Sequence, residues 1–228
     1  MLLLRWLDFI TMTSLYGYGV LLLNMMKNIF TLLVLAFSIS LCAQDHEQES
    51  IDYRKKLSLE YKSGENKVLT EREKKNFGYL NFYDFDPEFV VEARFEPLDN
   101  TEELQSKTST ARIATYTKYG YLHFTLKGKK CKLLVLSSPS LKDDPEYYNY
   151  LSVEFTDETN GKGSYKVGRY MELRAPLGET LTLNFNNTYN PYCAYSERFS
   201  CPIPPAENHL PVKVTAGVQE GFRSFRKF

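Results

Sequence analysis

The residues best suited to chemistry lie in one stretch, from Asp157 to Asn208. Arg169 follows a glycine in a predicted strand, where its planar guanidinium could clamp a carboxylate or phosphate through two parallel hydrogen bonds. Tyrosine and asparagine side chains around a proline-rich segment offer neutral donors and acceptors that suit a small polar or anionic ligand. The candidate ligand-binding residues are Arg169, Tyr170, Asn186, Tyr189, Asn190 and Asn208.

Each of these residues also has a structural interpretation. Arg169 could form an ion pair with Asp157 or Glu172. The asparagines could hydrogen bond to the backbone of an irregular loop that has no strand partner. The segment 157–161 reads as a hairpin turn, with a calcium site as the alternative. The sequence leaves both interpretations open.

Two cysteines, Cys193 and Cys201, flank a short loop and form the predicted disulfide. Closing this loop would remove roughly 2.5 kcal/mol of unfolded-chain entropy. Redox-active thiols and metal ligands are the alternatives, but the spacing does not suit a Cys-x-x-Cys motif, and zinc would need two more ligands from only three histidines. We therefore predict no metal site. Cys131 shares a strand face with Leu133 and Val135 and is expected to be a buried small hydrophobe.

Familiar catalytic and nucleic-acid signatures are missing from the sequence. It contains no Gly-x-Ser-x-Gly, no His-Glu-x-x-His and no phosphate-binding glycine loop. No cofactor can be assigned from these residues. His123 lies between two apolar residues of a predicted strand and is expected to face solvent or to be satisfied within the fold. The 28 basic residues balance the 28 acidic ones, so no long-range attraction to nucleic acid is expected.

The N-terminal region predicts export. The basic segment 26–28 precedes an apolar run, 29–41, then the tripeptide 42–44 and an abruptly charged stretch, 45–49. This order is typical of a secretory signal peptide. We expect translation to start at Met26, with the preceding residues as an upstream extension.

Cleavage after Ala43 would complete this processing and leave a mature chain of residues 44–228 without a transmembrane helix. A lipid anchor at Cys42 would need a small residue before the cysteine, where the sequence has Leu41. The expected location is the periplasm or cell envelope, an oxidising compartment that permits a disulfide.

Helical signals are confined to the beginning of the mature chain. Tyr53, Leu57 and Tyr61 recur at four-residue steps, which predicts an amphipathic helix over 46–61. Thr70 and Glu73 have the spacing of a capping box, so a second, short helix should begin there.

From Glu88 onward the apolar period changes to two, as in half-buried strands. Gly120, Gly128, the pair 160–161 and Gly178 are the expected turn residues. Short strands without crossover helices predict a mainly β fold, an antiparallel barrel or sandwich with one or two N-terminal helices, in a single domain over 44–228. The predicted strands are 88–95, 111–118, 121–127, 131–136, 150–156, 169–174, 180–185 and 210–215.

Four motifs in the stretch are distinctive: Asp157-x-Thr159-x-Gly161, Tyr165-x-x-Gly168-Arg169-Tyr170, Phe185-Asn186-x-x-Tyr189-Asn190-Pro191-x-Cys193-Ala194 and Cys201-Pro202-x-Pro204-Pro205-x-Glu207-Asn208. Together they resemble the bacterial family catalogued as domain of unknown function 1684. The chain departs from that family's pattern at Asn184, His209 and Val218, where an Asp, an Arg and a Glu are usual. The resemblance implies no activity, substrate or cofactor.

These observations support three functional hypotheses. The first is an exported protein that binds a small polar or anionic ligand under the proline-rich disulfide loop. The second is a hydrolase-like enzyme in which Arg169 stabilises negative charge and Asp157 or a tyrosine moves protons. The third is a structural component of the envelope.

Overall fold

The computed structural model describes residues 27, 30–31, 45–64, 67–99 and 102–224. The predicted signal peptide and upstream extension, Cys42 included, lie almost entirely outside these residues. Residues 46–228 make up one compact unit. Among the described residues, no helix combines the length and the apolar character needed to cross a bilayer.

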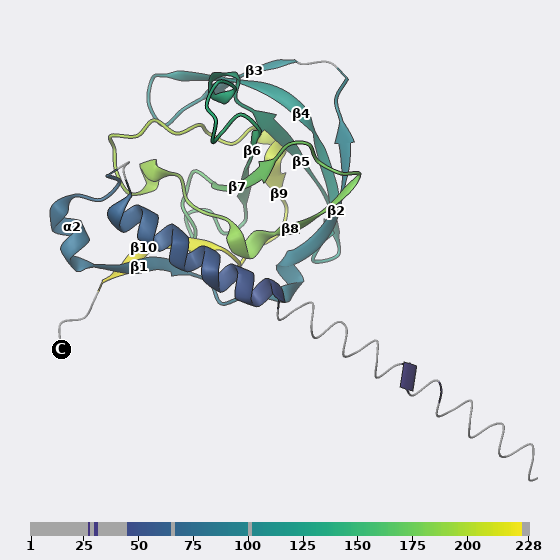
Figure 1. Ribbon diagram of the computed structural model, residues 1–228, viewed down its shortest axis with the longest axis horizontal. Coiled ribbons are helices and arrows are strands. Elements are labelled where there is room, and N and C mark those ends of the chain that lie inside the picture. Colours follow the sequence, from purple (N-terminus) through teal and green to yellow (C-terminus); the bar gives the residue numbers. More distant parts are fainter. Residues whose placement is uncertain (1–26, 28–29, 32–44, 65–66, 100–101, 225–228) are drawn as a thin grey trace, which may run out of the picture. The chain divides into compact units, whose positions relative to one another are not determined.

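Most strands belong to one eight-stranded sheet, ordered β7-β6-β5-β4-β2-β8, with β3 on β4 and β9 on β6. Every pair is antiparallel except β6 with β9. The sheet curls into a half-barrel (Figure 1), which confirms the mainly β, antiparallel prediction. The strands are β2 (Val90–Pro97), β3 (Glu103–Lys107), β4 (Ile113–Leu126), β5 (Lys129–Ser137), β6 (Tyr150–Asp157), β7 (Arg169–Arg174), β8 (Thr180–Asn184) and β9 (His209–Leu210).

The core lies inside the curl of this sheet. Phe89 and Ala93 are buried there while Glu92 and Arg94 face outward, as the period of two predicts. Cys131 is buried in the same apolar cluster, so its predicted packing role is confirmed. Burial also raises the pKa of its thiol.

The longest hairpin joins β4 to β5 through a two-residue turn. Lys127 and Gly128 both have positive φ, 48° and 76°, as the tightest hairpin turns require. The turn predicted at Gly128 is therefore confirmed. Gly120 was predicted as a turn too, but this is wrong: it lies inside β4, where a Cβ would be 2.4 Å from the ring of Phe95. The predicted strands 111–118 and 121–127 are thus one strand.

The predicted strand 210–215 is also wrong beyond Leu210. Val212, Val214 and Ala216 are buried in the core, which explains their apolar spacing. The carbonyl groups of Val214 and Ala216 accept hydrogen bonds from the buried guanidinium of Arg169. A side chain here replaces the neighbouring strand as the partner of the backbone.

A second, smaller layer consists of a helix over 45–63, α2 (Glu71–Asn76) and the antiparallel pair of β1 (Phe77–Phe82) and β10 (Val218–Ser224). Leu57 and Tyr61 of the long helix belong to one buried apolar cluster with residues of β1 and β10, so the predicted amphipathic face is confirmed. Figure 1 shows the helix beside this strand pair. The capping box is present as well: the Glu73 amide donates to Thr70 Oγ1 at 3.3 Å, and the Thr70 amide donates to Glu73 Oε2 at 2.7 Å.

Candidate functional site

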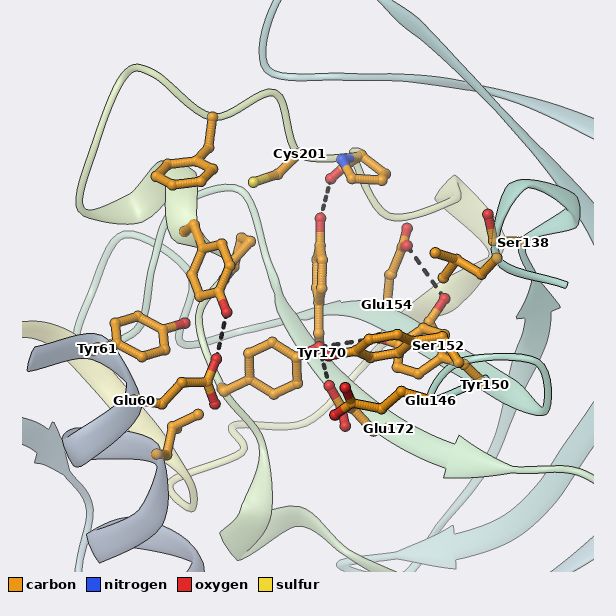
Figure 2. A pocket seen from close by; sticks show the side chains of 18 of the residues that line it. Glu60, Tyr61, Ser138, Glu146, Tyr150, Ser152, Glu154, Tyr170, Glu172 and Cys201 are labelled. Atoms are coloured by element: carbon orange, nitrogen blue, oxygen red, sulfur yellow. Dashed lines mark hydrogen bonds between the residues drawn. The ribbon is translucent and has the colours of Figure 1, made fainter. Parts of the chain in front are cut away.

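A pocket of about 570 Å³ is lined by helix 45–63, by one face of β4, β6 and β7, by the segment 138–147 and by the loop 191–202. This volume is within the range of small-molecule sites. Its lining is dominated by tyrosines (Figure 2): Tyr53, Tyr61, Tyr116, Tyr147, Tyr150, Tyr170, Tyr189 and Tyr192.

Charged residues are the other notable part of the lining. The carboxylates outnumber the cations, and they approach the pocket from the helix, from the segment before β6 and from the sheet. The four acidic residues are Glu60, Glu146, Glu154 and Glu172, and the two basic ones are Lys56 and Arg174.

Glu154 lies deepest among these carboxylates. Its residue surface is only 1% exposed, and Ser152 donates to its Oε1 at 3.4 Å. Its Oε2 is buried without a hydrogen-bond partner in the described part of the chain. Burial raises the pKa of Glu154 to about 7, although the neighbouring hydroxyl groups of Tyr116 and Ser152 act in the opposite direction. The group can therefore give or accept a proton near neutral pH.

The face that carries Glu154 continues onto β7. Ser152 pairs with Glu172, and Glu154 pairs with Tyr170, so the four side chains share one surface of the sheet. Tyr189 donates to Glu172 Oε1 at 3.2 Å and lies 3.3 Å from the Tyr150 hydroxyl. Burial, first of all, raises the pKa of Glu172 too.

The loop 191–202 forms another wall of the pocket, where Tyr192 contacts Glu60 and Tyr61 of the helix. The loop includes the two cysteines of the predicted disulfide. The Tyr170 hydroxyl donates to the carbonyl of Pro202. Both cysteines are free thiols in the structure, and the Cys193 amide donates to Cys201 Sγ at 3.3 Å. The two residues are thus adjacent, and the disulfide stays a prediction.

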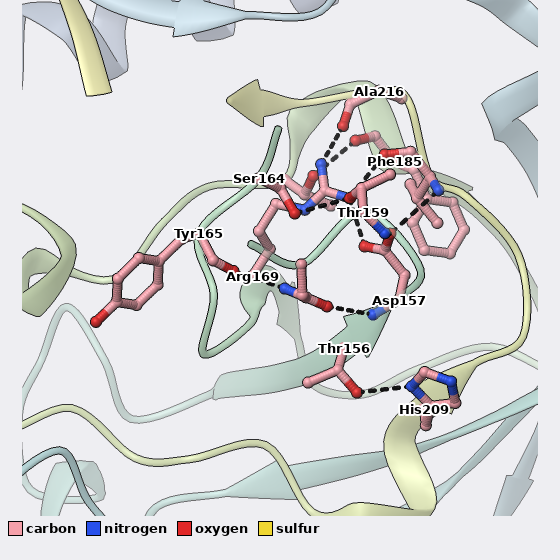
Figure 3. A network of polar contacts seen from close by, with 12 residues as sticks. Thr156, Asp157, Thr159, Ser164, Tyr165, Arg169, Phe185, His209 and Ala216 are labelled. Atoms are coloured by element: carbon pink, nitrogen blue, oxygen red, sulfur yellow. Dashed lines mark hydrogen bonds and ion pairs between the residues drawn. The ribbon is translucent and has the colours of Figure 1, made fainter. Parts of the chain in front are cut away.

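Arg169 lies inside the fold, within a network of polar contacts (Figure 3). Its side chain is 0% exposed, and Nη2 donates to Asp157 Oδ2 at 2.7 Å and to the Val214 carbonyl at 2.8 Å. Arg169 is not among the residues that line the pocket, and its Nη atoms already bond to protein acceptors. The prediction that Arg169 clamps a ligand is corrected, and the alternative ion pair with Asp157 is the arrangement found. Asp157 thereby also loses its predicted proton-transfer role, because it is enclosed with Arg169.

The segment after β6 is the predicted turn. The Asp157 carboxylate accepts from the Thr159 amide at 2.7 Å, and Asn160 Oδ1 accepts from the Asp157 amide. The carboxylate is thus already engaged by protein donors, which does not fit the calcium alternative. No group of three or more His, Cys, Asp or Glu side chains able to hold a metal occurs in the described residues.

The predicted asparagines also act within the fold. Asn186 bonds to the backbone of Asp86 through both Oδ1 and Nδ2, each at 3.0 Å. Asn208 Oδ1 accepts from the Leu134 amide at 2.7 Å, and its Nδ2 donates to the carbonyl groups of Leu134 and Glu154. None of these asparagines lines the pocket.

Asn190 is 1% exposed and its Nδ2 donates to the Tyr195 hydroxyl at 3.1 Å and to the Gln219 carbonyl at 2.9 Å. The asparagines therefore stabilise irregular backbone, which corrects their predicted role. Of the six predicted ligand residues, the structure brings only Tyr170 and Tyr189 to the pocket.

Sequence reasoning missed Glu154. One signal for it exists: Glu154 lies between Val153 and Phe155, and the strand buries residues on both of its faces. A carboxylate inside such a strand is rare unless it is paired or functional.

The family comparison matches this architecture. The model of a protein family of unknown function, DUF1684, matches residues 75–219. The chain belongs to this family. The match includes β6, β7 and the loop 191–202, whereas the helix wall of the pocket precedes the matched residues.

A solved structure supports the same assignment for this DUF1684 protein. It is the solution NMR structure of an uncharacterized protein of Haloarcula marismortui, 33% identical in sequence, with a TM-score of 0.60. The similarity covers 77% of this chain and 95% of the other. No curated protein matches the chain.

Proposed function

We propose that this DUF1684 protein binds a small polar ligand in the tyrosine-lined pocket, with Glu154 as the anchoring group. The observation that carries the proposal is the unpartnered Oε2 of Glu154 within a cavity of about 570 Å³. A buried carboxylate oxygen without a partner costs roughly 1–3 kcal/mol or more. A ligand that donates a hydrogen bond to it would recover this energy.

The negative balance of charge among the pocket-lining residues indicates which class of ligand fits. Four carboxylates against two cations make the pocket unfavourable for an anion. The anionic ligand expected from Arg169 therefore has little support, because that guanidinium is enclosed elsewhere. A neutral or cationic polar ligand fits better, with the tyrosine rings covering its apolar part.

We further propose that the protein is exported and that Cys193 and Cys201 form a disulfide after export. The support is the signal-like segment 26–43 and the adjacency of the two cysteines. This bond would stabilise the loop 191–202, which is one wall of the pocket.

A fragment screen by ligand-observed NMR tests the binding proposal. The screen compares neutral, cationic and anionic compounds on the wild-type protein, on Ser138→Trp and on Thr182→Trp. Ser138 lines the pocket, so a tryptophan there should block it. Thr182 is exposed on β8, at the other edge of the sheet. We expect compounds that bind the wild type and Thr182→Trp but not Ser138→Trp. Compounds that bind both variants as they bind the wild type would contradict the proposal.

A hydrolase is the second candidate, favoured by two carboxyl groups on one sheet face. Glu154 and Glu172 are diagonal neighbours in the β6–β7 ladder, a relation that puts Cα atoms roughly 7–8 Å apart. Glu154 has the raised pKa of a general acid, and Glu172 could act as a base or nucleophile. Turnover of a glycoside or ester panel that is lost in both Glu154→Gln and Glu172→Gln would favour this reading.

A further inference from the structure

Resting on the proposed function, we propose that the ligand carries a protonated amine, which binds at the base of the pocket between the Glu154 carboxylate and the surrounding phenol rings.

The first support is the missing counter-ion of Glu154. The ionisable groups around it are three phenols, Tyr116 from β4, Tyr150 from its own strand and Tyr170 from β7, and a second carboxyl group, Glu172 of β7, its diagonal neighbour in the ladder. Burial raises the pKa of each of these phenols, so all three are neutral at physiological pH. Within the described residues, Glu154 forms no salt bridge. An ionised carboxylate in this position is therefore uncompensated, and a cationic ligand group would pair with it.

The second support is the arrangement of the rings. Aromatic faces attract cations, and tyrosine-lined pockets suit ammonium groups. The pocket mouth already shows this contact: the Arg174 guanidinium lies 5.6 Å from the Tyr147 ring centroid and 5.5 Å from that of Tyr150. Deeper in the pocket, Tyr170 and Tyr189 form an edge-to-face pair with centroids 5.8 Å apart. At the pocket mouth the protein itself supplies a cation, Arg174. At the base of the pocket it supplies a carboxylate and aromatic rings but no cation among the described residues.

The third support comes from the alternatives. An anion would face an uncompensated Glu154 as well as the other three lining carboxylates. A neutral ligand could bond to Glu154 but would leave its negative charge unpaired, so such a ligand should favour the protonated acid. The affinities of amine ligands and of neutral ligands should therefore change in opposite directions with pH. Because the pKa of Glu154 is about 7, affinity for an amine should rise as pH rises through 7.

The test is isothermal titration with phenethylamine and its neutral counterpart 2-phenylethanol, at pH 8 and pH 6. The amine stays protonated at both values, so its pH dependence reports the protein. We expect the amine to bind at least tenfold more tightly than the alcohol at pH 8. Its affinity should fall about tenfold at pH 6, because the ionised fraction of a group with a pKa near 7 falls by that factor. Glu154→Gln should abolish the preference for the amine, while the exposed Glu158→Gln should keep it.

Several results would overturn the inference. Equal binding of both probes refutes the cationic group of the ligand. Amine binding that does not change between pH 8 and pH 6 in the wild type refutes Glu154 as the partner of that group. Either result leaves the binding pocket itself in place. This pH comparison needs no variant, so it decides even if Glu154→Gln folds poorly. If neither probe binds but other fragments do, the inference of an amine ligand is refuted and the proposed function is not. Failure of both probes together with an empty fragment screen refutes the proposed function as well.

Discussion

Ionisation of Glu154 should destabilise the folded protein. Its pKa is raised from 4.5 to about 7 in the folded state, so the folded state holds this proton more tightly than the unfolded state. The contribution to stability is therefore complete below pH 4.5 and is lost as pH rises to 7. A shift of about 2.5 units corresponds to about 3 kcal/mol. Glu154→Gln cannot ionise and should remove this loss.

Urea unfolding of the wild type and of Glu154→Gln at several values between pH 4.5 and pH 8 measures the effect. The difference between the two free energies of unfolding cancels the titration of other groups, including Glu172. It should change by about 3 kcal/mol over this range, in favour of the variant at high pH. Glu158→Gln should show no such change. Parallel profiles for the wild type and Glu154→Gln would refute the raised pKa and the burial on which it depends.

Three further variants, two single and one double, test the surrounding structure. Arg169→Ala leaves a buried carboxylate unpaired and should lower the free energy of unfolding by about 3–5 kcal/mol in urea; an unchanged value would contradict the enclosed ion pair. Asn208→Ala removes hydrogen bonds to buried backbone groups and should cost about 3 kcal/mol, whereas a melting temperature equal to that of the wild type would oppose this role. In oxidised protein, Cys193→Ser with Cys201→Ser should cost about 2.5 kcal/mol, and the mass of the wild type should rise by two hydrogens on reduction; free thiols in exported protein would disprove the disulfide.

The strands and helices that depend on local pattern could be predicted from the sequence. The capping box at Thr70 and Glu73 predicted a helix start, and the alternation around Ala93 predicted a strand. Both patterns depend only on residues close together in the sequence. Gly120 was misread because the ring that covers it, Phe95, comes from a neighbouring strand. The strands 77–82, 103–107 and 218–224 were not predicted, since their pairing depends on partners distant in sequence or on short, mixed segments.

The site was predicted only in part, for a related reason. Polar residues near a proline loop suggested a ligand, but sequence spacing does not show which of them face a cavity. Asn186 and Asn208 satisfy backbone groups of other segments, and those contacts exist only in the folded chain. Tyr170 and Tyr189 reach the pocket because they flank the sheet face on which Glu154 lies. A carboxylate in a strand buried on both faces was the signal that could have led to that face.

The most direct test of the binding claim is the mass of the protein purified from its native source, measured under native and then denaturing conditions. We predict a reproducible adduct of small-molecule mass that denaturation releases and that Ser138→Trp prevents. A wild-type protein that carries no adduct, and that acquires none when incubated with a small-molecule extract of the same cells, would contradict the claim that the tyrosine-lined pocket is a ligand site.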